Sequence, residues 1–173
     1  RNFIEKIKKR HGYNKISLIL KKFKKLKVMI IGELIIDRYC FGNIIGKSGK
    51  EPHLVLQQNE IEHYLGGSAA IANHLSSFVN KIEILSPFGF EKFYKNLIKN
   101  TFSKNIKTHF IKPEKNYKTI TKTRFVDQIS GYKLFGSYIL PSNHDLDFIS
   151  KVRKIIKNQK NKIDYFLVCD YGH

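Results

Sequence analysis

The chain has 173 residues, and its 32 lysines and arginines against 14 aspartates and glutamates give a formal net charge of +18 at pH 7. A chain of this length forms one domain with a buried core, and no apolar stretch approaches the ~20 residues that a membrane-spanning helix needs. The N-terminus carries charge without the apolar core of a signal peptide, which predicts a cytoplasmic protein without a membrane partner.

The excess of lysine has two interpretations. It can attract nucleic acid through counterion release, or it can lie dispersed over every solvent-exposed face. Proteins that read nucleic acid favour arginine forks and interleaved aromatic residues, whereas the lysines here are spread along the chain. We therefore favour the dispersed interpretation and expect no nucleic-acid partner.

The first 26 residues predict two helices joined by a turn at His11-Gly12-Tyr13-Asn14, because apolar residues recur at helical spacing between lysines. We expect residues 1–26 to be a helical linker and residues 27–173 to belong to one domain. A basic amphipathic helix could instead lie on a membrane surface, but a docking linker is the interpretation that we favour.

From residue 27 onward, apolar runs of strand length alternate with helical patterns. Strands are expected over 27–32, 53–62, 82–85, 107–111, 117–127, 132–140 and 164–170, and helices over 67–78, 91–99 and from the capping residues Ser142, Asn143 and Asp145 to about 159. Ser130-Gly131 separates two extended runs as a hairpin turn does. This alternation predicts an α/β fold with a doubly wound, mostly parallel Rossmann-like sheet and a small antiparallel β lid.

Asp37 and the pair Gly66-Gly67 are the first candidate binding residues. Asp37 follows the strand that ends at Gly32, in what we expect to be a loop, and open α/β sheets bind ligands at this end of their strands. The two glycines let a backbone approach a ligand without a Cβ, and they open a helix whose first amides are free. The alternatives for Asp37 are an Asx turn or a pair with Arg38. The alternative for the two glycines is an ordinary glycine turn before a helix. A carboxylate beside an approachable backbone suits a polyhydroxylated small molecule.

Lys122 and Arg124 lie two residues apart on a predicted strand, so both point to one face, with Thr121 and Thr123 on the other. Two cations on one face suit a phosphorylated sugar, because an arginine fork binds phosphate oxygens in pairs. The alternative is a solvated strand edge, where lysine protects against aggregation.

Two cysteines and seven histidines show no metal-binding spacing. We expect Cys40 in a loop after the first strand and Cys169 inside a buried strand, both as reduced thiols. The chain starts at Arg1 and stops at His173, directly after an apolar run, so we expect a fragment.

Five segments occur in the order found in one enzyme family: Gly46-Lys-Ser-Gly-Lys-Glu-Pro52, Leu65-Gly-Gly67, Ala72-Asn-His-Leu-Ser76, Arg124-Phe-Val-Asp127 and Asp170-Tyr-Gly-His173. With these the chain resembles the ribokinase-like (PfkB) carbohydrate kinases from about residue 27 to its end. Within them it is most similar to the heptose-phosphate kinase branch, in domains fused behind a cytidylyltransferase-like domain.

The resemblance implies roles for single residues. Asp37 would accept hydrogen bonds from sugar hydroxyls, and Glu33 stands where the branch more often has Asp. Ala70 stands where the family commonly has Asn, so either Asn73 substitutes from the same helix face or the sugar contact is lost. Asp170 would lie near the nucleotide.

The resemblance also implies ATP and Mg²⁺ as cofactors of a full-length parent, whose catalytic base is an Asp in a late Gly-Ala-Gly-Asp turn. This chain contains no such turn, so no catalytic residue is assigned, the base is expected beyond His173, and the segment alone is expected to be inactive and to bind no cofactor completely. A homodimer through the β lid and an upstream nucleotidyltransferase-like domain are the expected partners besides the sugar. The alternatives are a lysine-rich nucleic-acid-binding module and a noncatalytic interaction domain.

Overall fold

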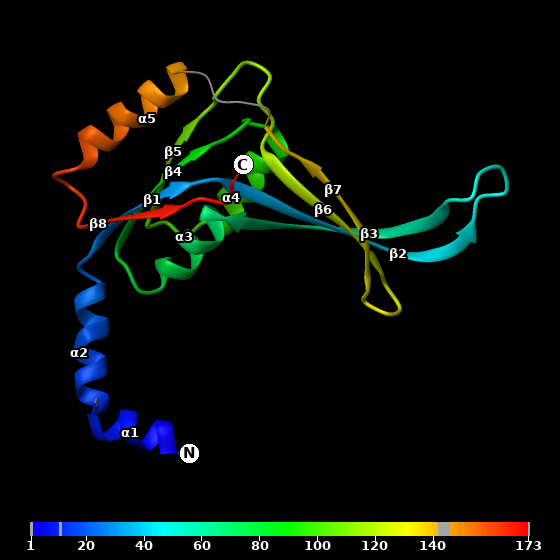
Figure 1. Cartoon of the computed structure of the whole chain (residues 1–173). Helices are drawn as coiled ribbons and strands as arrows, with labels where there is room; N and C mark the ends of the chain where they lie inside the picture. Colours follow the sequence, from blue (N-terminus) through cyan, green and yellow to red (C-terminus); the bar gives the residue numbers. More distant parts are fainter. Residues whose placement is uncertain (1, 11, 142–145, 173) are drawn as a thin grey trace.

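The computed structural model describes residues 2–10, 12–141 and 146–172, which form two four-stranded sheets with helices beside them (Figure 1). The helices are α1 (Asn2–Arg10), α2 (Tyr13–Phe23), α3 (Ser68–Ser76), α4 (Lys92–Thr101) and α5 (Leu146–Gln159). The strands are β1 (Lys27–Gly32), β2 (Leu34–Lys47), β3 (Leu54–Gly67), β4 (Lys81–Pro87), β5 (Ile106–Ile111), β6 (Ile120–Asp127), β7 (Lys133–Ile139) and β8 (Tyr165–Cys169).

The first sheet has the order β5-β4-β1-β8, and all of its neighbouring strands are parallel. Val28 and Ile30 of β1 pack into a core that includes residues of α3 and α4, while Met29 between them packs into a second core against α5. Helices thus cover both faces, and this confirms the expected α/β fold. It also explains why β1 is apolar at successive positions rather than at alternate ones.

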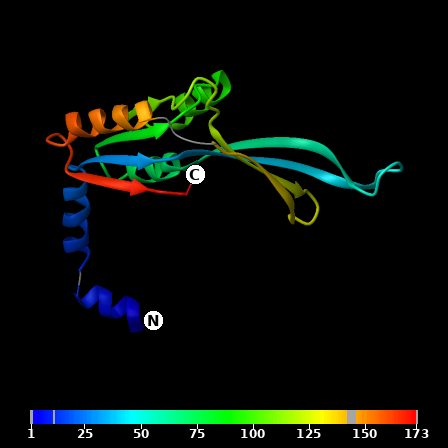
Figure 2. The same ribbon diagram turned by 45° about the horizontal axis from the view of Figure 1, so that its top comes forward.

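The second sheet, which we call the lid sheet, has the order β3-β2-β6-β7. The β2–β3 and β6–β7 pairs are antiparallel, but β2 and β6 are parallel, so the lid is mixed rather than purely antiparallel. Only Glu33 separates β1 from β2, so the chain passes directly from one sheet into the other. The β2–β3 hairpin then extends well beyond the body of the molecule (Figures 1 and 2).

Two local expectations are corrected, and a third concerns residues that the structure does not describe. Asp37 and Cys40 lie on β2 instead of in a loop, and Cys40 is buried, because β2 is paired on both sides, by β3 and by β6. The helix after the double glycine begins at Ser68 and ends at Ser76, with Gly67 as its N-cap. The predicted cap of α5 by Ser142, Asn143 and Asp145 lies outside the described residues.

β8 was expected to be a buried strand, but it pairs with β1 alone and forms one edge of the parallel sheet. Tyr165 and Val168 are 61% and 70% exposed, because no described element covers the far side of the strand. At the same end of the molecule, α1 and α2 form a helical arm that projects away from the sheets (Figures 1 and 2).

Candidate functional site

The crossing between the two sheets is held by the start of α3. The Ser68 backbone N–H donates to the carbonyl oxygen of Glu33 at 2.9 Å, and the Ser68 hydroxyl donates to the carbonyl oxygen of Gly32 at 3.1 Å. Gly67 turns the chain into this contact with φ of 58°, and a Cβ on it would lie 2.3 Å from the Glu33 carbonyl oxygen. Glycine is therefore required at position 67 by the backbone itself.

Asp37 and Gly66 meet on the face of the lid sheet opposite to α4. Tyr64 is the direct partner of Asp37 on β3, and Gly66 pairs with Ile35, so Gly66 is the diagonal neighbour of Asp37. A Cβ on Gly66 would lie 2.3 Å from Oδ2 of Asp37. The structure thus brings Asp37 and Gly66 together, and Gly66, which is buried, leaves the space that the carboxylate occupies.

Arg124 of β6 binds Asp37, with Nη1 at 2.5 Å from Oδ1, and the two side chains are 23% and 26% exposed. The hydrogen bond that Arg124 donates to Asp37, together with the negative charge of Asp37, raises the pKa of Arg124 above its usual value. Arg38 points to the opposite face of β2, as neighbours on a strand do, so the alternative pair between Asp37 and Arg38 does not form.

Lys122 is the β6 partner of Asp37 and shares the open face with Arg124, whereas Thr121 and Thr123 are buried on the other face, as predicted. The alternative of a solvated edge is wrong, because β6 lies inside the sheet between β2 and β7. The Lys122 ammonium lies 5.7 Å from the ring centroid of Tyr138 on β7. Lys122 and Arg124 therefore share one face of the lid with Asp37.

A hollow of about 350 Å³ lies beside this ion pair, lined by Asp37, Tyr39, Phe41, Glu62 and Tyr64. The Tyr64 hydroxyl donates to Glu62 at 2.6 Å, and the rings of Tyr39 and Tyr64 meet edge to face. The hydrogen bond to Glu62 raises the pKa of the Tyr64 hydroxyl. The sequence singled out neither tyrosine nor Glu62, although the period of two along β2 places Tyr39 on the same face as Asp37.

Glu33 lies apart from this hollow and is buried at the sheet crossing. The Tyr171 backbone N–H donates to Oε2 of Glu33 at 3.2 Å, so Glu33 lies next to the segment that follows β8. Burial, and then the negative charge of Glu33, raises the pKa of the Cys169 thiol. Asp170 turns its carboxylate to its own chain, where Oδ1 accepts from the Gly172 N–H at 2.9 Å.

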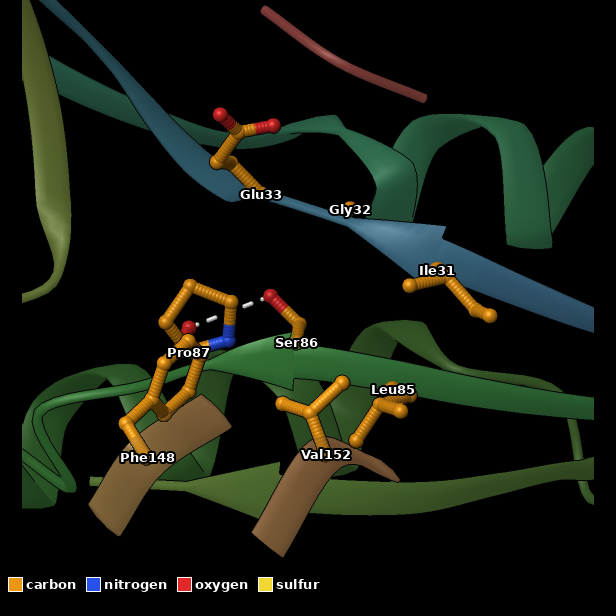
Figure 3. A pocket seen from close by; sticks show the side chains of 8 residues that line it. All are labelled: Ile31, Gly32, Glu33, Leu85, Ser86, Pro87, Phe148 and Val152. Atoms are coloured by element: carbon orange, nitrogen blue, oxygen red, sulfur yellow. Dashed lines mark hydrogen bonds between the residues drawn. The ribbon is translucent and has the colours of Figure 1, made fainter. Parts of the chain in front are cut away.

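A second cavity, of about 180 Å³, lies at the carboxyl ends of β1 and β4 beneath α5 (Figure 3). Its lining is mainly apolar, and it comprises Ile31, Gly32, Glu33, Leu85, Ser86, Pro87, Phe148 and Val152. The Glu33 carboxylate points away from Ser86 and Pro87 in this view. The Ser86 hydroxyl accepts from the Leu34 N–H and donates to the Pro87 carbonyl, so it is already used within the protein.

Asn73 lies in the middle of α3 and is half-buried, and it does not line the hollow around Asp37. Among residues 2–10, 12–141 and 146–172, no group of three or more His, Cys, Asp or Glu side chains converges as a metal site would require. The structure therefore brings Asp37, Gly66, Lys122 and Arg124 together on one face of the lid sheet, whereas Gly67 and Glu33 lie at the crossing between the sheets and Asn73 and Asp170 lie elsewhere.

Comparison with known proteins gives a family and a fold. The model of the family described as "pfkB family carbohydrate kinase" matches residues 25–165. Two proteins called "Bifunctional protein HldE" are similar: that of Helicobacter pylori is 30% identical over 147 residues, and that of Aliarcobacter butzleri is 29% identical over 153 residues. These matches cover 84% and 86% of this chain, and 31% of each relative.

A carbohydrate kinase from Agrobacterium tumefaciens has a similar solved structure, with a TM-score of 0.55 at 14% identity. That match covers 83% of this chain and 45% of the solved chain. The chain also spans only about a fifth to a third of the length of the curated relatives it matches. Both sheets of the fold are thus represented within less than half of a solved kinase.

Proposed function

The chain belongs to the pfkB family of carbohydrate kinases, and we propose that it forms the substrate-binding and lid half of an ATP-dependent kinase for a heptose-like sugar phosphate. The observation that carries the proposal is the contact of Asp37 with both Gly66 and Arg124 on the open face of the lid. A hydroxyl acceptor and an anion-binding fork lie there within one site, beside a glycine that leaves room for the carboxylate. Such an enzyme would serve the synthesis of a nucleotide sugar or cell-surface polysaccharide precursor.

Asp37 would accept hydrogen bonds from sugar hydroxyls, and the ionised carboxylate makes these bonds stronger than a neutral acceptor does. Its Oδ2 lies over Gly66, while Oδ1 is held by Arg124. Arg124 therefore fixes the orientation of the carboxylate before the sugar arrives. Tyr39 and Tyr64 offer apolar ring surface beside it, which suits the carbon-bound hydrogens of a sugar ring.

The phosphate of the substrate would be bound by the two cations of β6. Arg124 uses Nη1 for Asp37, and a guanidinium has five N–H donors in a planar fork, so donors remain for an anion. Lys122 lies on the same face at the strand position directly beside Asp37. Glu33 and Asn73, which do not line the hollow around Asp37, are proposed as further substrate contacts, and Asp170 as a contact on the nucleotide side.

The transfer itself would need residues that this chain does not contain. In a kinase of this family a general base takes the proton of the sugar hydroxyl as its oxygen attacks the γ-phosphorus of ATP, and ADP leaves with its charge neutralised by Mg²⁺. The resemblance assigns that base to a later glycine-flanked Asp. We propose that the second half of the domain pairs with the open edge of β8 and completes the ATP site, and that the isolated chain has no kinase activity.

The long β2–β3 hairpin supports a homodimer formed through the lid. Ile45 and Leu54, at its far end, are 63% and 61% exposed, and a second lid could cover them. An upstream nucleotidyltransferase-like domain, joined through residues 1–26, remains a further proposal, as does a cytoplasmic location.

Ligand-dependent thermal melts of the chain test the site. We expect a heptose phosphate to raise the melting temperature more than the unphosphorylated heptose does. Asp37→Asn should weaken binding of both sugars by about tenfold or more, because an amide cannot act as an ionised acceptor. Arg124→Lys should weaken binding of the phosphorylated sugar selectively, because lysine lacks the planar fork.

Glu114→Gln, which changes an exposed carboxylate in a loop outside the lid, is the matched control and should change neither melt. The proposal fails if no sugar phosphate stabilises the chain, or if Arg124→Lys lowers both affinities equally. Steeply salt-dependent binding of nucleic acid, with no response to sugars, would favour the binding-module alternative instead.

A further inference from the structure

The helical arm formed by α1 and α2 has no part in the proposed sugar site. The family match begins at residue 25, after the end of α2. Both helices project from the body of the molecule, and α1 lies farthest from the sheets (Figures 1 and 2). The function of the arm must therefore be inferred from its own surface.

The first 27 residues, which comprise the arm, its connection to β1 and the first residue of β1, carry more than half of the formal net charge of the chain. Residues 1–27 contain 11 lysines and arginines and one acidic residue, Glu5, which gives +10 of the total net charge of +18. The remaining 146 residues carry +8. Basic residues are thus denser in residues 1–27 than in the rest of the chain, which still carries +8.

α1 separates its apolar and basic residues into two faces. At 100° per residue, Phe3, Ile4 and Ile7 fall within one arc of the helix. Lys6 and Arg10 flank one side of this arc and Lys8 the other. Long basic side chains at these positions can extend their charged ends to phosphate groups while their methylene stems lie along an apolar layer.

The apolar face of α1 is open to solvent. Phe3 is 74% exposed and Ile4 is 60% exposed, so the rest of the described chain does not cover them. In α2, Leu20 and Phe23 line an apolar groove together with residues of β8 and α3. The end of the arm away from this groove presents an uncovered amphipathic helix.

We propose that the arm, through the apolar face of α1 and the basic residues around it, binds the surface of an anionic lipid bilayer. A short helix with segregated faces, many lysines and little overall hydrophobicity lies in the membrane interface, and each basic residue adds attraction to anionic headgroups. In the part of the chain that the structure describes, no helix has the length and apolar character needed to cross a bilayer. The arm therefore lies on the surface.

Two other partners fit the surface of α1 less well. Nucleic acid would neutralise the lysines but would leave Phe3 and Ile4 in water. A linker that docks on a neighbouring domain, the interpretation favoured from the sequence, would cover Phe3 and Ile4, and no residue that the structure describes covers them. A bilayer interface accommodates the apolar and the basic face at once.

Vesicle flotation of the whole chain tests the proposal. Binding to phosphatidylcholine vesicles that contain phosphatidylglycerol should be at least about tenfold tighter than binding to phosphatidylcholine alone, and it should weaken with added salt. Ile4→Ser combined with Ile7→Ser, and separately Lys6→Glu combined with Lys8→Glu, should each reduce binding by about tenfold or more.

The controls make the same chemical changes on the body of the molecule. Ile129→Ser removes an 85% exposed isoleucine at the β6–β7 turn, and Lys104→Glu with Lys107→Glu reverses two exposed charges near β5. Both controls should bind vesicles within about twofold of the unchanged chain. Equal losses in arm and body variants would overturn the proposal.

Two further results would assign the arm to another partner and overturn the proposal. One is self-association without vesicles that Ile4→Ser with Ile7→Ser abolishes, which would place a second copy on the apolar face. The other is binding of duplex RNA that is as tight as vesicle binding and unaffected by the same double substitution.

Discussion

At the scale of single residues, Gly66 and Gly67 are neighbours in the sequence, but one makes room for a side chain and the other for the backbone. The space beside Gly66 is filled by the end of the Asp37 side chain, and the space beside Gly67 by the backbone of Glu33. A side chain can move away, whereas a backbone oxygen at the crossing of two sheets cannot. The first glycine therefore belongs to the proposed site, and the second to the fold.

Gly66→Ala should displace the Asp37 carboxylate and weaken sugar binding by about tenfold, with a loss of less than about 1 kcal/mol in the free energy of unfolding. Gly67→Ala should cost about 1–3 kcal/mol, because alanine there combines a positive φ with a clash against the backbone. Urea unfolding and ligand melts measure the two effects. Gly49→Ala, where the added Cβ meets nothing within 4 Å, is the control. A greater loss of stability in Gly66→Ala than in Gly67→Ala would contradict this assignment.

At the scale of elements, β4 and β5 are joined by a buried charge cluster. Glu83 of β4 is 1% exposed and binds Lys81 at 2.9 Å and His109 of β5 at 2.7 Å. Burial raises the pKa of the Glu83 carboxyl, but the hydrogen bonds from Lys81 and His109 outweigh burial and leave the pKa below its ordinary value of 4.5. The carboxylate therefore stabilises the folded state while it is ionised.

Because the folded pKa is lowered, this stabilisation is complete above about pH 4.5 and is lost as the pH falls through the lowered value. Glu83→Gln should cost about 1–3 kcal/mol near pH 7, and the difference from the unchanged chain should shrink in acid. Denaturant unfolding at a series of pH values measures it. Glu60→Gln, at an exposed position of β3, should show no such trend. A constant difference down to low pH would show that Glu83 stabilises through packing alone.

At the scale of the whole molecule, the two sheets differ in how completely they are covered. The parallel sheet has helices on both faces but an exposed edge at β8, although β8 carries apolar residues at successive positions. Parallel strands are normally buried on both faces. The edge of β8 therefore has the composition of an interior strand and the exposure of a surface one.

Val168→Lys on β8 should change the free energy of unfolding of this chain by less than about 0.5 kcal/mol and reduce its aggregation, because charged residues protect open edges. The matched substitution Val28→Lys on the adjacent β1 replaces a 7% exposed valine and should cost more than about 3 kcal/mol. If the second half of a kinase domain is joined to the chain, Val168→Lys should become nearly as costly as Val28→Lys. An unchanged small cost in the joined protein would show that nothing packs on β8.

Much of the local structure was predictable from residue patterns. The ends of β1 and β5, the β6–β7 hairpin and the alternation of Lys122 and Arg124 with buried threonines follow from periods of two and from turn residues. The course of β2 was missed because its second half, from Gly42 to Lys47, has glycines and polar residues that are typical of a loop. Its strand conformation depends on pairing with β3, the next strand, and with β6, which lies far along the chain.

By itself, the sequence determined the α/β class, the order of the elements other than β2, and the glycines at 66 and 67, because these depend on local backbone preferences and on apolar periodicity. Only the tertiary structure decided that Arg124 rather than Arg38 binds Asp37, that Tyr39, Glu62 and Tyr64 line the hollow, and that β8 and the apolar face of α1 are uncovered. These properties depend on strand order and register between segments up to about half the chain apart. No local pattern records which surfaces the folded chain brings together.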